Sequence, residues 1–332
     1  MKRKSKRVFQ MAAVAAGMAV ILTAAFAMAA DYPRKAVTVV VPWPAGSATG
    51  IVGQKIVNII QQNKFFPQAM QIVYKPGASG TIGLAEVLQG KPDGYTIGYN
   101  PSAPILVQPL VKELPYTSQT LTPIIQTMQF PWLLVVKAEA PWKTIQEFLD
   151  YCKKHPGEVT VGTAGDYTWG HLALLQMTQA TGIKFRHVPF QGAAPNVTAL
   201  LGGHVQASLV VTGDVSAQIS AGKVRFIACV ETVRSAFAPD TPTFKELGYD
   251  VKGTMHTHIV VLPKGAAPDV IEILHEAFKK AIDTNDYKEF MKQVGGDPGY
   301  ISHKDLPAAI AAAVKEATRL LEGVGTKIRK VQ

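Results

Sequence analysis

Short apolar runs alternate with stretches of helical periodicity along most of the chain. The clearest run, Val37–Val41, is mostly β-branched and predicts a buried strand that ends at Pro42. A loop of small residues follows, and apolar residues then recur at helical spacing from Ile51 to Ile60. Ser47 or Thr49 is a suitable N-cap for this helix. The stretch therefore predicts a strand, a short loop and the N-terminus of a helix.

The same pattern returns further along the chain. We expect strands at 71–74, 95–99, 121–126, 132–137, 159–162, 185–189, 205–211, 224–230 and 255–262. We expect helices at 81–88, from 144, at 171–180 and 196–201, from Pro268 onward and in the Ala-rich C-terminal segment, with a loop beginning at Thr212. Such alternation is typical of α/β proteins in which helices cover a parallel sheet.

Two strong strands interrupt this alternation and enclose a compact α/β unit. They are the expected strands at 132–137 and 255–262. We interpret them as crossovers between two domains, so that the first domain is discontinuous. The predicted domains are 31–131 together with 257–332, and 132–256. About 300 residues follow the first 30, a length that suits two domains of ordinary size.

The first 30 residues have the composition of a secretory signal peptide. Five Lys or Arg residues precede Val8, and an uncharged apolar stretch runs from there to Met28. Residues 27–29, Ala-Met-Ala, fit the small-x-small cleavage pattern. An uncleaved membrane anchor is the alternative, because the stretch is nearly long enough to span a bilayer. We therefore predict a signal peptide at 1–30 and a soluble, periplasmic mature chain.

Removal of this segment halves the formal charge. The full chain carries +10, and loss of the five N-terminal cations (10 minus 5) leaves a mature chain near +5. The cationic residues are scattered, so nucleic-acid binding is not indicated, whereas a mildly positive field favours acidic small molecules. Cys152 and Cys229 are too few for a disulfide framework. We expect two buried free thiols; a disulfide is the alternative that export would permit.

Loops of small and polar residues follow the predicted strands in both domains. They lie at 43–49, 77–80 and 100–102 in the first domain, and at 163–169, 190–194 and 212–214 in the second. Ligands of open α/β sheets bind beyond the carboxyl ends of the strands, and free N–H groups at a helix N-terminus suit an anion. We therefore expect a cleft between two lobes that close by a hinge, with loop 43–49 holding a ligand carboxylate.

An ordered set of motifs resembles one family of receptors over nearly the whole mature chain. The segments read VTVVVPWPAGSATG, KPGASGTIG, KPDGYTIGY, HPGEVTVGTAG, HVPFQGAAP, AGKVRFIA and APDTPTFKELG. Together they look like the substrate-binding proteins of tripartite tricarboxylate transporters, the Bug (TctC-like) family. The resemblance implies a two-lobed, type II periplasmic-binding-protein fold. It also implies a carboxylate held in the cleft largely by backbone amides and ordered water, for delivery to membrane transporter subunits.

One position departs from the family pattern. The first loop of the family usually carries an Asp near the helix start, where this chain has Gly50, and Ser47 replaces the second of two glycines. In members that bind amino or amide compounds, that Asp can meet the ligand's nitrogen. We interpret its absence as an argument against a cationic or amide head group, and in favour of a dicarboxylate or an aromatic carboxylate. Asp166 and Asp214 are the alternatives that could supply the missing charge.

We expect residues of both domains to hold the ligand. They are Trp43, Ala45, Gly46, Ser47, Ala48, Thr49, Ser79 and Ser102 in the first domain, and Gly165, Asp166, Tyr167, Thr168, Trp169, Gln191, Gly192, Ala193 and Asp214 in the second. Neither a cofactor nor a metal is expected. His256 and His258 share one face of a strand, but no acidic or Cys partner stands at a useful spacing.

These patterns predict a monomeric receptor without catalytic residues. The G-x-S-x-G nucleophile pattern fails at both Ser47 and Ser79, and GASGTIG lacks the dinucleotide-binding spacing. Paired carboxylates or a Cys/His set do not stand out. Two other classes stay open: a receptor that presents its ligand to a signalling partner, and a secreted hydrolase.

Overall fold

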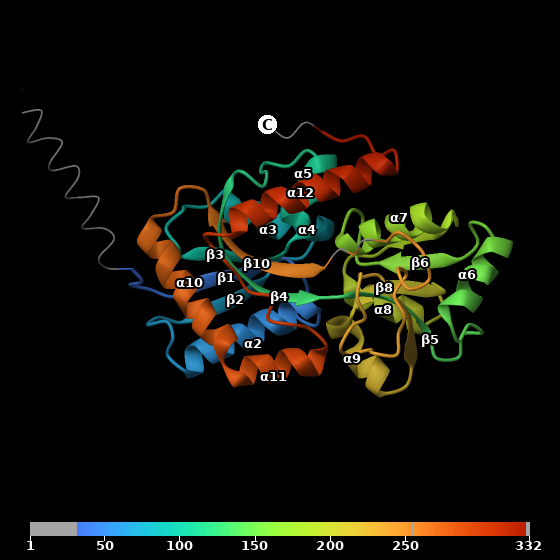
Figure 1. The fold of residues 1–332 in the computed structure, drawn as a ribbon. Coiled ribbons are helices and arrows are strands. Elements are labelled where there is room, and N and C mark those ends of the chain that lie inside the picture. The colour runs from blue at the N-terminus through green and yellow to red at the C-terminus, as the bar shows by residue number, and fades with distance from the viewer. Residues whose placement is uncertain (1–31, 252, 254, 330–332) are drawn as a thin grey trace, which may run out of the picture.

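Two separate β-sheets, one in each half of an elongated molecule, organise the fold (Figure 1). The computed structural model describes residues 32–251, 253 and 255–329, so the predicted signal peptide lies outside the described residues. The first sheet has the strand order β11-β4-β10-β3-β1-β2, and the second has the order β7-β6-β8-β5-β9. We call the two halves the first lobe and the second lobe. In the described part of the chain, no helix has the length and apolar character needed to cross a membrane.

The first lobe is built around a six-stranded sheet. Its strands are β1 (Val37–Val41), β2 (Met70–Tyr74), β3 (Thr96–Pro101), β4 (Leu121–Phe130), β10 (His256–Pro263) and β11 (Ile301–Ser302). Its helices are α2 (Ala48–Gln62), α3 (Thr81–Leu88), α4 (Ala103–Leu106), α5 (Gln108–Val111), α10 (Pro268–Asp283), α11 (Asn285–Val294) and α12 (Leu306–Gly323), with a 3₁₀ turn at Ala78–Gly80. Most of the apolar stripe of α2, including Ile56 and Ile60, is buried as helical periodicity predicts, whereas Ile51 is exposed.

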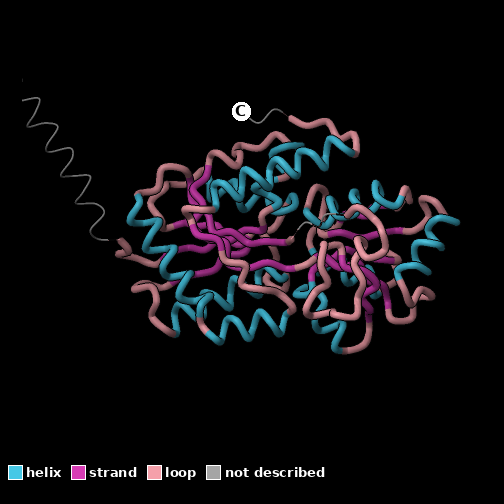
Figure 2. Tube along the Cα trace, viewed as in Figure 1, coloured by secondary structure: helices cyan, strands magenta, loops and turns pink. Residues whose placement is uncertain are grey.

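The second lobe is built around a five-stranded sheet. Its strands are β5 (Trp132–Lys137), β6 (Thr160–Thr163), β7 (Arg186–Pro189), β8 (Ala207–Val211) and β9 (Val224–Cys229). Its helices are α6 (Ile145–Lys154), α7 (Trp169–Thr181), α8 (Ala193–Leu201) and α9 (Thr212–Ser220). Helices lie on both faces of each sheet (Figure 2). Cys152 and Cys229 are buried free thiols.

Both sheets are mixed: the strands of the predicted alternation pair in parallel, and other strands run antiparallel to them. β1 is parallel to β2 and β3, and β6 is parallel to β7 and β8, but β10 and β5 run antiparallel to their neighbours. The reason is that β5 and β10 are the first strands after the chain crosses between lobes, so each starts at the lobe interface. Trp132 consequently pairs with Val211, the last residue of β8. The exact domain boundaries stay a prediction.

The segment at Thr212 is a helix, so the prediction of a loop there is wrong. α9 starts directly at Thr212, with Val211 as its N-cap. The Thr-Gly-Asp sequence is typical of a turn, but Asp214 instead occupies the first turn of the helix. An acidic residue there is favourable because it faces the positive end of the helix dipole.

Candidate ligand-binding cleft

The loop between β1 and α2 is shaped by its own hydrogen bonds. Ser47 is the N-cap of α2: its Oγ accepts from the Gly50 N–H at 3.2 Å and donates to the Pro44 carbonyl at 2.6 Å. A Cβ added at Gly50 would lie 2.5 Å from the Ala45 carbonyl oxygen and 2.7 Å from that of Pro44. Position 50 therefore has no room for a side chain, and an Asp could not stand there without rebuilding the loop.

Two strained loops meet across the lobes. Ala78 and Ser79 in the β2–α3 loop and Tyr167 in the β6–α7 loop have positive φ, which is uncommon for residues other than glycine. A Cβ added at Gly165, whose φ is +142°, would lie only 2.5 Å from the Ser79 Oγ. Backbone strain of this kind clusters at ligand clamps and active sites. The two loops are therefore in direct contact, with each lobe contributing one.

Three hydrogen bonds link the same lobes. The Gln108 side chain donates to the carbonyls of Asp166 at 2.7 Å and Tyr167 at 3.1 Å. The indole N–H of Trp169 donates to the Ser102 Oγ at 2.8 Å. The structure is therefore a closed form of the two lobes.

A fourth hydrogen bond between the lobes is the most informative chemically. The backbone N–H of Ala48, the first residue of α2, donates to the Asp214 Oδ1 at 2.9 Å. The N-terminus of α2 thus already holds a carboxylate, which is the ligand type that such an end favours. That carboxylate comes from α9 of the second lobe.

A small cavity lies between the lobes, and we call it the cleft cavity. It has a volume of about 30 Å³ and is lined by Trp43, Ser47, Ala48, Thr49, Ala103, Trp132, Ala164, Thr168, Trp169, Ala193, Asp214 and His256. This volume holds little more than a single water molecule. A ligand can enter only when the lobes part. Three of the four tryptophans of the chain line this one cavity.

Eight of the predicted site residues line the cleft cavity. They are Trp43, Ser47, Ala48, Thr49, Thr168, Trp169, Ala193 and Asp214. A smaller pocket of about 10 Å³, which shares Trp43 and Ala164 with the cleft cavity, is lined by three more: Ser79, Gln191 and Gly192. Gly165 contacts Ser79, and Ser102 holds Trp169, as described above. Ala45, Gly46, Asp166 and Tyr167 line neither cavity.

Four lining residues were missed by the sequence reasoning: Ala103, Trp132, Ala164 and His256. Trp132 and His256 are the first residues of β5 and β10, the two antiparallel strands. The sequence reasoning placed the site only on loops that follow parallel strands. The recognition of 132–137 and 255–262 as crossovers was the signal that could have indicated both residues.

The carboxylate of Asp214 is enclosed, although the residue keeps some exposure elsewhere. Burial raises the pKa of this carboxyl to about 6, and the hydrogen bond from Ala48 offsets part of that effect. Asp166, the other predicted source of charge, is exposed and faces His187, with 3.7 Å between its Oδ1 and the imidazole Nδ1. Among the described residues, Asp214 alone therefore brings a negative charge into the cleft cavity.

A chain of buried polar groups leads from the cleft into the first lobe. The Nε2 atoms of His256 and His258 are 2.8 Å apart, and the His258 Nε2 is also 3.1 Å from the Thr49 Oγ1. The His258 Nδ1 lies 3.0 Å from the Tyr99 hydroxyl. Burial lowers the pKa of His256 to about 4 and that of His258 well below its usual value. Both imidazoles are therefore neutral at pH 7.

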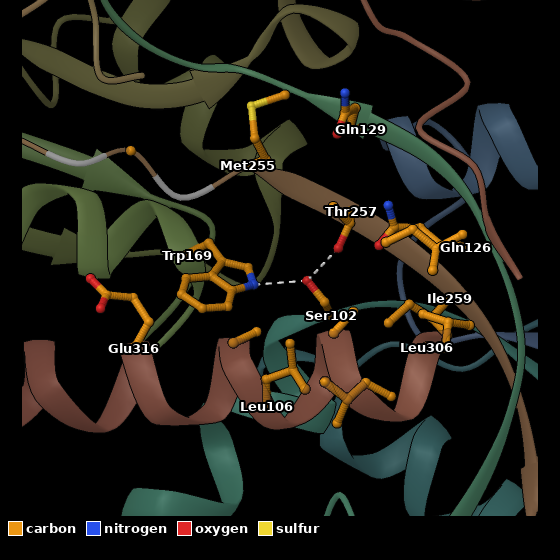
Figure 3. A pocket seen from close by; sticks show the side chains of 15 residues that line it. Ser102, Leu106, Gln126, Gln129, Trp169, Met255, Thr257, Ile259, Leu306 and Glu316 are labelled. Carbon is orange, nitrogen blue, oxygen red and sulfur yellow. Dashed lines mark hydrogen bonds between the residues drawn. The ribbon is translucent and has the colours of Figure 1, made fainter. Parts of the chain in front are cut away.

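A larger cavity of about 320 Å³ is bordered by α12 and by the indole of Trp169 (Figure 3). Its lining is mostly apolar, with Leu106, Ile259 and Leu306 prominent, and Gln126 and Thr257 add polar groups. The indole of Trp169 lines both this cavity and the cleft cavity. It is therefore a wall shared by the two spaces.

One cluster at the edge of the second lobe has metal-ligating side chains: Asp166, His171 and His187. The two imidazole rings stack with centroids 4.0 Å apart and an interplanar angle of 14°. The rings are nearly parallel, so the lone pairs of their nitrogen atoms point side by side. The nitrogen atoms of His171 and His187 therefore do not converge on one ion. One ring nitrogen of each is also in a hydrogen bond, to the Tyr167 N–H and to the Thr163 Oγ1 respectively. The arrangement favours a structural role in holding the β6–α7 loop.

Two α/β lobes that close over a cavity at the carboxyl ends of parallel strands define a two-lobed solute-binding protein. The model for the tripartite tricarboxylate transporter family receptor, TctC, matches residues 57–326, and the chain belongs to this family. Receptors of this family are periplasmic.

Relatives and solved structures agree with this assignment. An UPF0065 protein of Cupriavidus necator, from the gbd 5' region, is 32% identical over 321 residues, which are 95% of each chain. The structure of the periplasmic binding protein BugD has a TM-score of 0.83 at 27% identity and covers 89% of this chain and 99% of its own. MatC from Rhodopseudomonas palustris, solved with bound malate, has a TM-score of 0.79 at 25% identity, with 88% of this chain and 100% of MatC covered. The family and these solved neighbours are binding proteins rather than enzymes.

Proposed function

We propose that this protein is a periplasmic receptor that captures a small organic carboxylate in the cleft between its lobes and delivers it to a membrane transporter of the tripartite tricarboxylate type. The observation that carries the proposal is the bond from the Ala48 N–H to a carboxylate oxygen at the start of α2. That amide lies in the cleft cavity and is positioned for a carboxylate. The malate bound by MatC supports the same class of ligand.

Three indoles around one cavity bear on the body of the ligand. Trp43, Trp132 and Trp169 present flat apolar surface, which suits a ring or another flat group. Of the two predicted classes, these walls favour an aromatic carboxylate over a dicarboxylate.

Capture would proceed by closure of the lobes over the ligand. The ligand carboxylate would bind the amides at the start of α2 in the open form. The β6–α7 loop of the second lobe, including Thr168, would then close against Ser79 of the first lobe. Closure excludes water, and electrostatic contacts strengthen in the drier cavity. None of these steps needs a catalytic residue.

A thermal-shift screen of the mature chain, residues 31–332, tests the proposal directly. A ligand at 100 times its Kd stabilises the folded state by about 2.7 kcal/mol, which raises the Tm by several degrees. We expect such a shift with aromatic or aliphatic carboxylates, accompanied by a change in tryptophan fluorescence. If amines and amides raise the Tm while no carboxylate does, the proposal fails.

The two other classes have their own readouts. Turnover of a bound ligand, followed by chromatography, would identify the hydrolase. Co-purification with a sensor protein instead of transporter subunits, using the ligand-loaded receptor as bait, would identify the signalling receptor.

A further inference from the structure

The cleft cavity is charged, and its charge has one sign. Asp214 is the only charged side chain among the described residues that line it, and no Lys or Arg is present there. His256 is the other titratable group, and burial lowers its pKa to about 4, so it is neutral at pH 7. The described lining of the cavity therefore carries one negative charge and no cation to balance it.

This charge disfavours the simplest ligands of the proposed class. A monocarboxylate would bring a second negative charge beside Asp214, and a dicarboxylate would bring a second and a third. Like charges in an enclosed site repel strongly because little water screens them. The amide of Ala48, moreover, is already occupied by Asp214. A ligand that brings only anions must displace that carboxylate from Ala48 and leave it with the Val211 amide of its own lobe.

The walls of the cavity suit a cation. The indole face is the most favourable aromatic surface for a cationic group, and Trp43, Trp132 and Trp169 surround the same small space as Asp214. His256 packs edge-on against Trp132, with ring centroids 5.4 Å apart at an interplanar angle of 84°. An enclosed carboxylate among indoles is the combination that recognises an ammonium group.

We propose that the ligand carries a cationic nitrogen in addition to its carboxylate, and that Asp214 pairs with this nitrogen between the three tryptophans. The proposal rests on the proposed function. On binding, the ligand carboxylate takes the Ala48 amide, and Asp214 turns to the ligand nitrogen. Both poles of the ligand then bind at neighbouring points, because Asp214 and Ala48 are in contact.

This inference changes the interpretation of Gly50. Position 50 has no room for a carboxylate of its own. The structure instead brings one to the same helix end from the opposite lobe, through Asp214. The absence of Asp at position 50 is therefore no argument against a cationic head group.

Matched probes test the inference on the wild-type mature chain. The aromatic set is 3-phenylpropanoate, phenylalanine, benzylsuccinate and 2-phenylethylamine, which share a skeleton and differ in charged groups. The aliphatic set is pentanoate, 2-aminopentanoate and pentanedioate. We expect the amino acid of at least one set to bind tenfold or more tightly than its monocarboxylate and its dicarboxylate at pH 7.5, by calorimetry or tryptophan fluorescence.

The isosteric variant Asp214→Asn identifies the residue responsible. We expect it to weaken binding of the amino acid tenfold or more, and to leave the monocarboxylate unchanged or bound more tightly. The matched control is Asp150→Asn, because Asp150 is an exposed carboxylate on α6 of the same lobe. It should retain wild-type affinities. Circular dichroism and the Tm establish that both variants are folded.

A measurement on the wild-type protein keeps the test valid if Asp214→Asn does not fold. Asp214 must be ionised to hold a cation, so affinity for the amino acid should fall below pH 6 while that for the monocarboxylate rises. Of the lining residues that the structure describes, His256 from β10 is the other titratable group, and α2 and α7 contribute only uncharged residues. Its pKa of about 4 separates its titration from that of Asp214.

The opposite results separate the two proposals. One opposite result is that monocarboxylates or dicarboxylates bind more tightly than the amino acids, and that Asp214→Asn increases the affinity for these anions further. Asp214 then competes with the ligand carboxylate, so the inference is wrong and the proposed function stands. If none of the probes binds to either protein at 10 mM, the proposed function fails and the inference fails with it.

Discussion

The contact between Gly165 and Ser79 predicts that one methyl group will hinder closure of the lobes. The variant Gly165→Ala adds a Cβ on the β6–α7 loop, 2.5 Å from the Ser79 Oγ of the first lobe. The two residues belong to different lobes, so this clash exists only in the closed form. The strain of a side chain at φ +142° is present in the open and closed forms alike.

The magnitude follows from the geometry. A carbon–oxygen contact of 2.5 Å is roughly 0.9 Å shorter than an ordinary contact. Overpacking costs about 1–3 kcal/mol, and the lower part of that range applies here because the Ser79 hydroxyl can rotate away from the new methyl group. We therefore expect about a tenfold loss of ligand affinity, since 1.4 kcal/mol corresponds to a factor of ten. The Ser79 Cβ would lie 3.4 Å from the new methyl group, an acceptable distance. Ser79→Ala should therefore restore most of the loss.

The assay is a double-mutant cycle on ligand affinity. Gly165→Ala, Ser79→Ala and the double variant are titrated with the best ligand from the thermal-shift screen, and the Tm of each is measured without ligand. We expect a coupling free energy of about 1–2 kcal/mol between the two sites in binding. The Tm should instead report the backbone strain, which Gly165→Ala and the double variant share.

Additive effects would refute the reasoning. If the two single losses sum to that of the double variant within about 0.5 kcal/mol, the loops do not touch in the ligand-bound form. The closed arrangement of this structure would then differ from the one that holds the ligand.

Two further predictions concern pH and the β1–α2 loop. Burial lowers the pKa of His256 to about 4 and of His171 to about 3, so the folded state binds fewer protons than the unfolded state below pH 6.5. The raised pKa of Asp214, about 6, acts in the opposite direction between pH 6 and 4. The effect of the histidines exceeds that of Asp214, and burial lowers the pKa of His187 and His258 as well. The free energy of unfolding should therefore fall by at least about 3 kcal/mol from pH 7 to pH 4. The fall should be steeper in Asp214→Asn, and the Tm at each pH measures both. Gly50→Ala should destabilise the protein by about 1–3 kcal/mol and weaken binding, because its Cβ meets the Ala45 carbonyl oxygen at 2.5 Å; unchanged Tm and affinity would contradict the loop geometry.

The local architecture of the site could be predicted from the sequence. The β-branched run before Pro42 and the helical periodicity after it define β1 and α2, and Ser47 is the N-cap that the sequence suggests. The expected helix at 81–88 and the strand at 132–137 have the observed bounds. These features depend on interactions between residues that are close in sequence, so periodicity and capping residues are sufficient to find them.

The composition of the cavity could not be predicted in the same way. Trp132 and His256 reach the cleft because β5 and β10 begin at the lobe interface, whereas the parallel strands end there. Strand direction within a sheet depends on how the chain crosses between lobes, and periodicity does not report it. The loops alone gave most of the lining, and the antiparallel strands supply a tryptophan and the histidine.

The surroundings of the Asp214 carboxylate, and so its pKa, depend on whether the lobes are closed. When the lobes part, Asp214 would lose the Ala48 amide and regain water, so its pKa would move from about 6 back toward the usual carboxyl range. Closing over the ionised carboxylate therefore carries a desolvation cost. A ligand cation that pairs with Asp214 would offset this cost, whereas a simple anion would add to it. A ligand that carries both charges would therefore favour the closed form over one without the cation, so that the same carboxylate selects the ligand and favours closure.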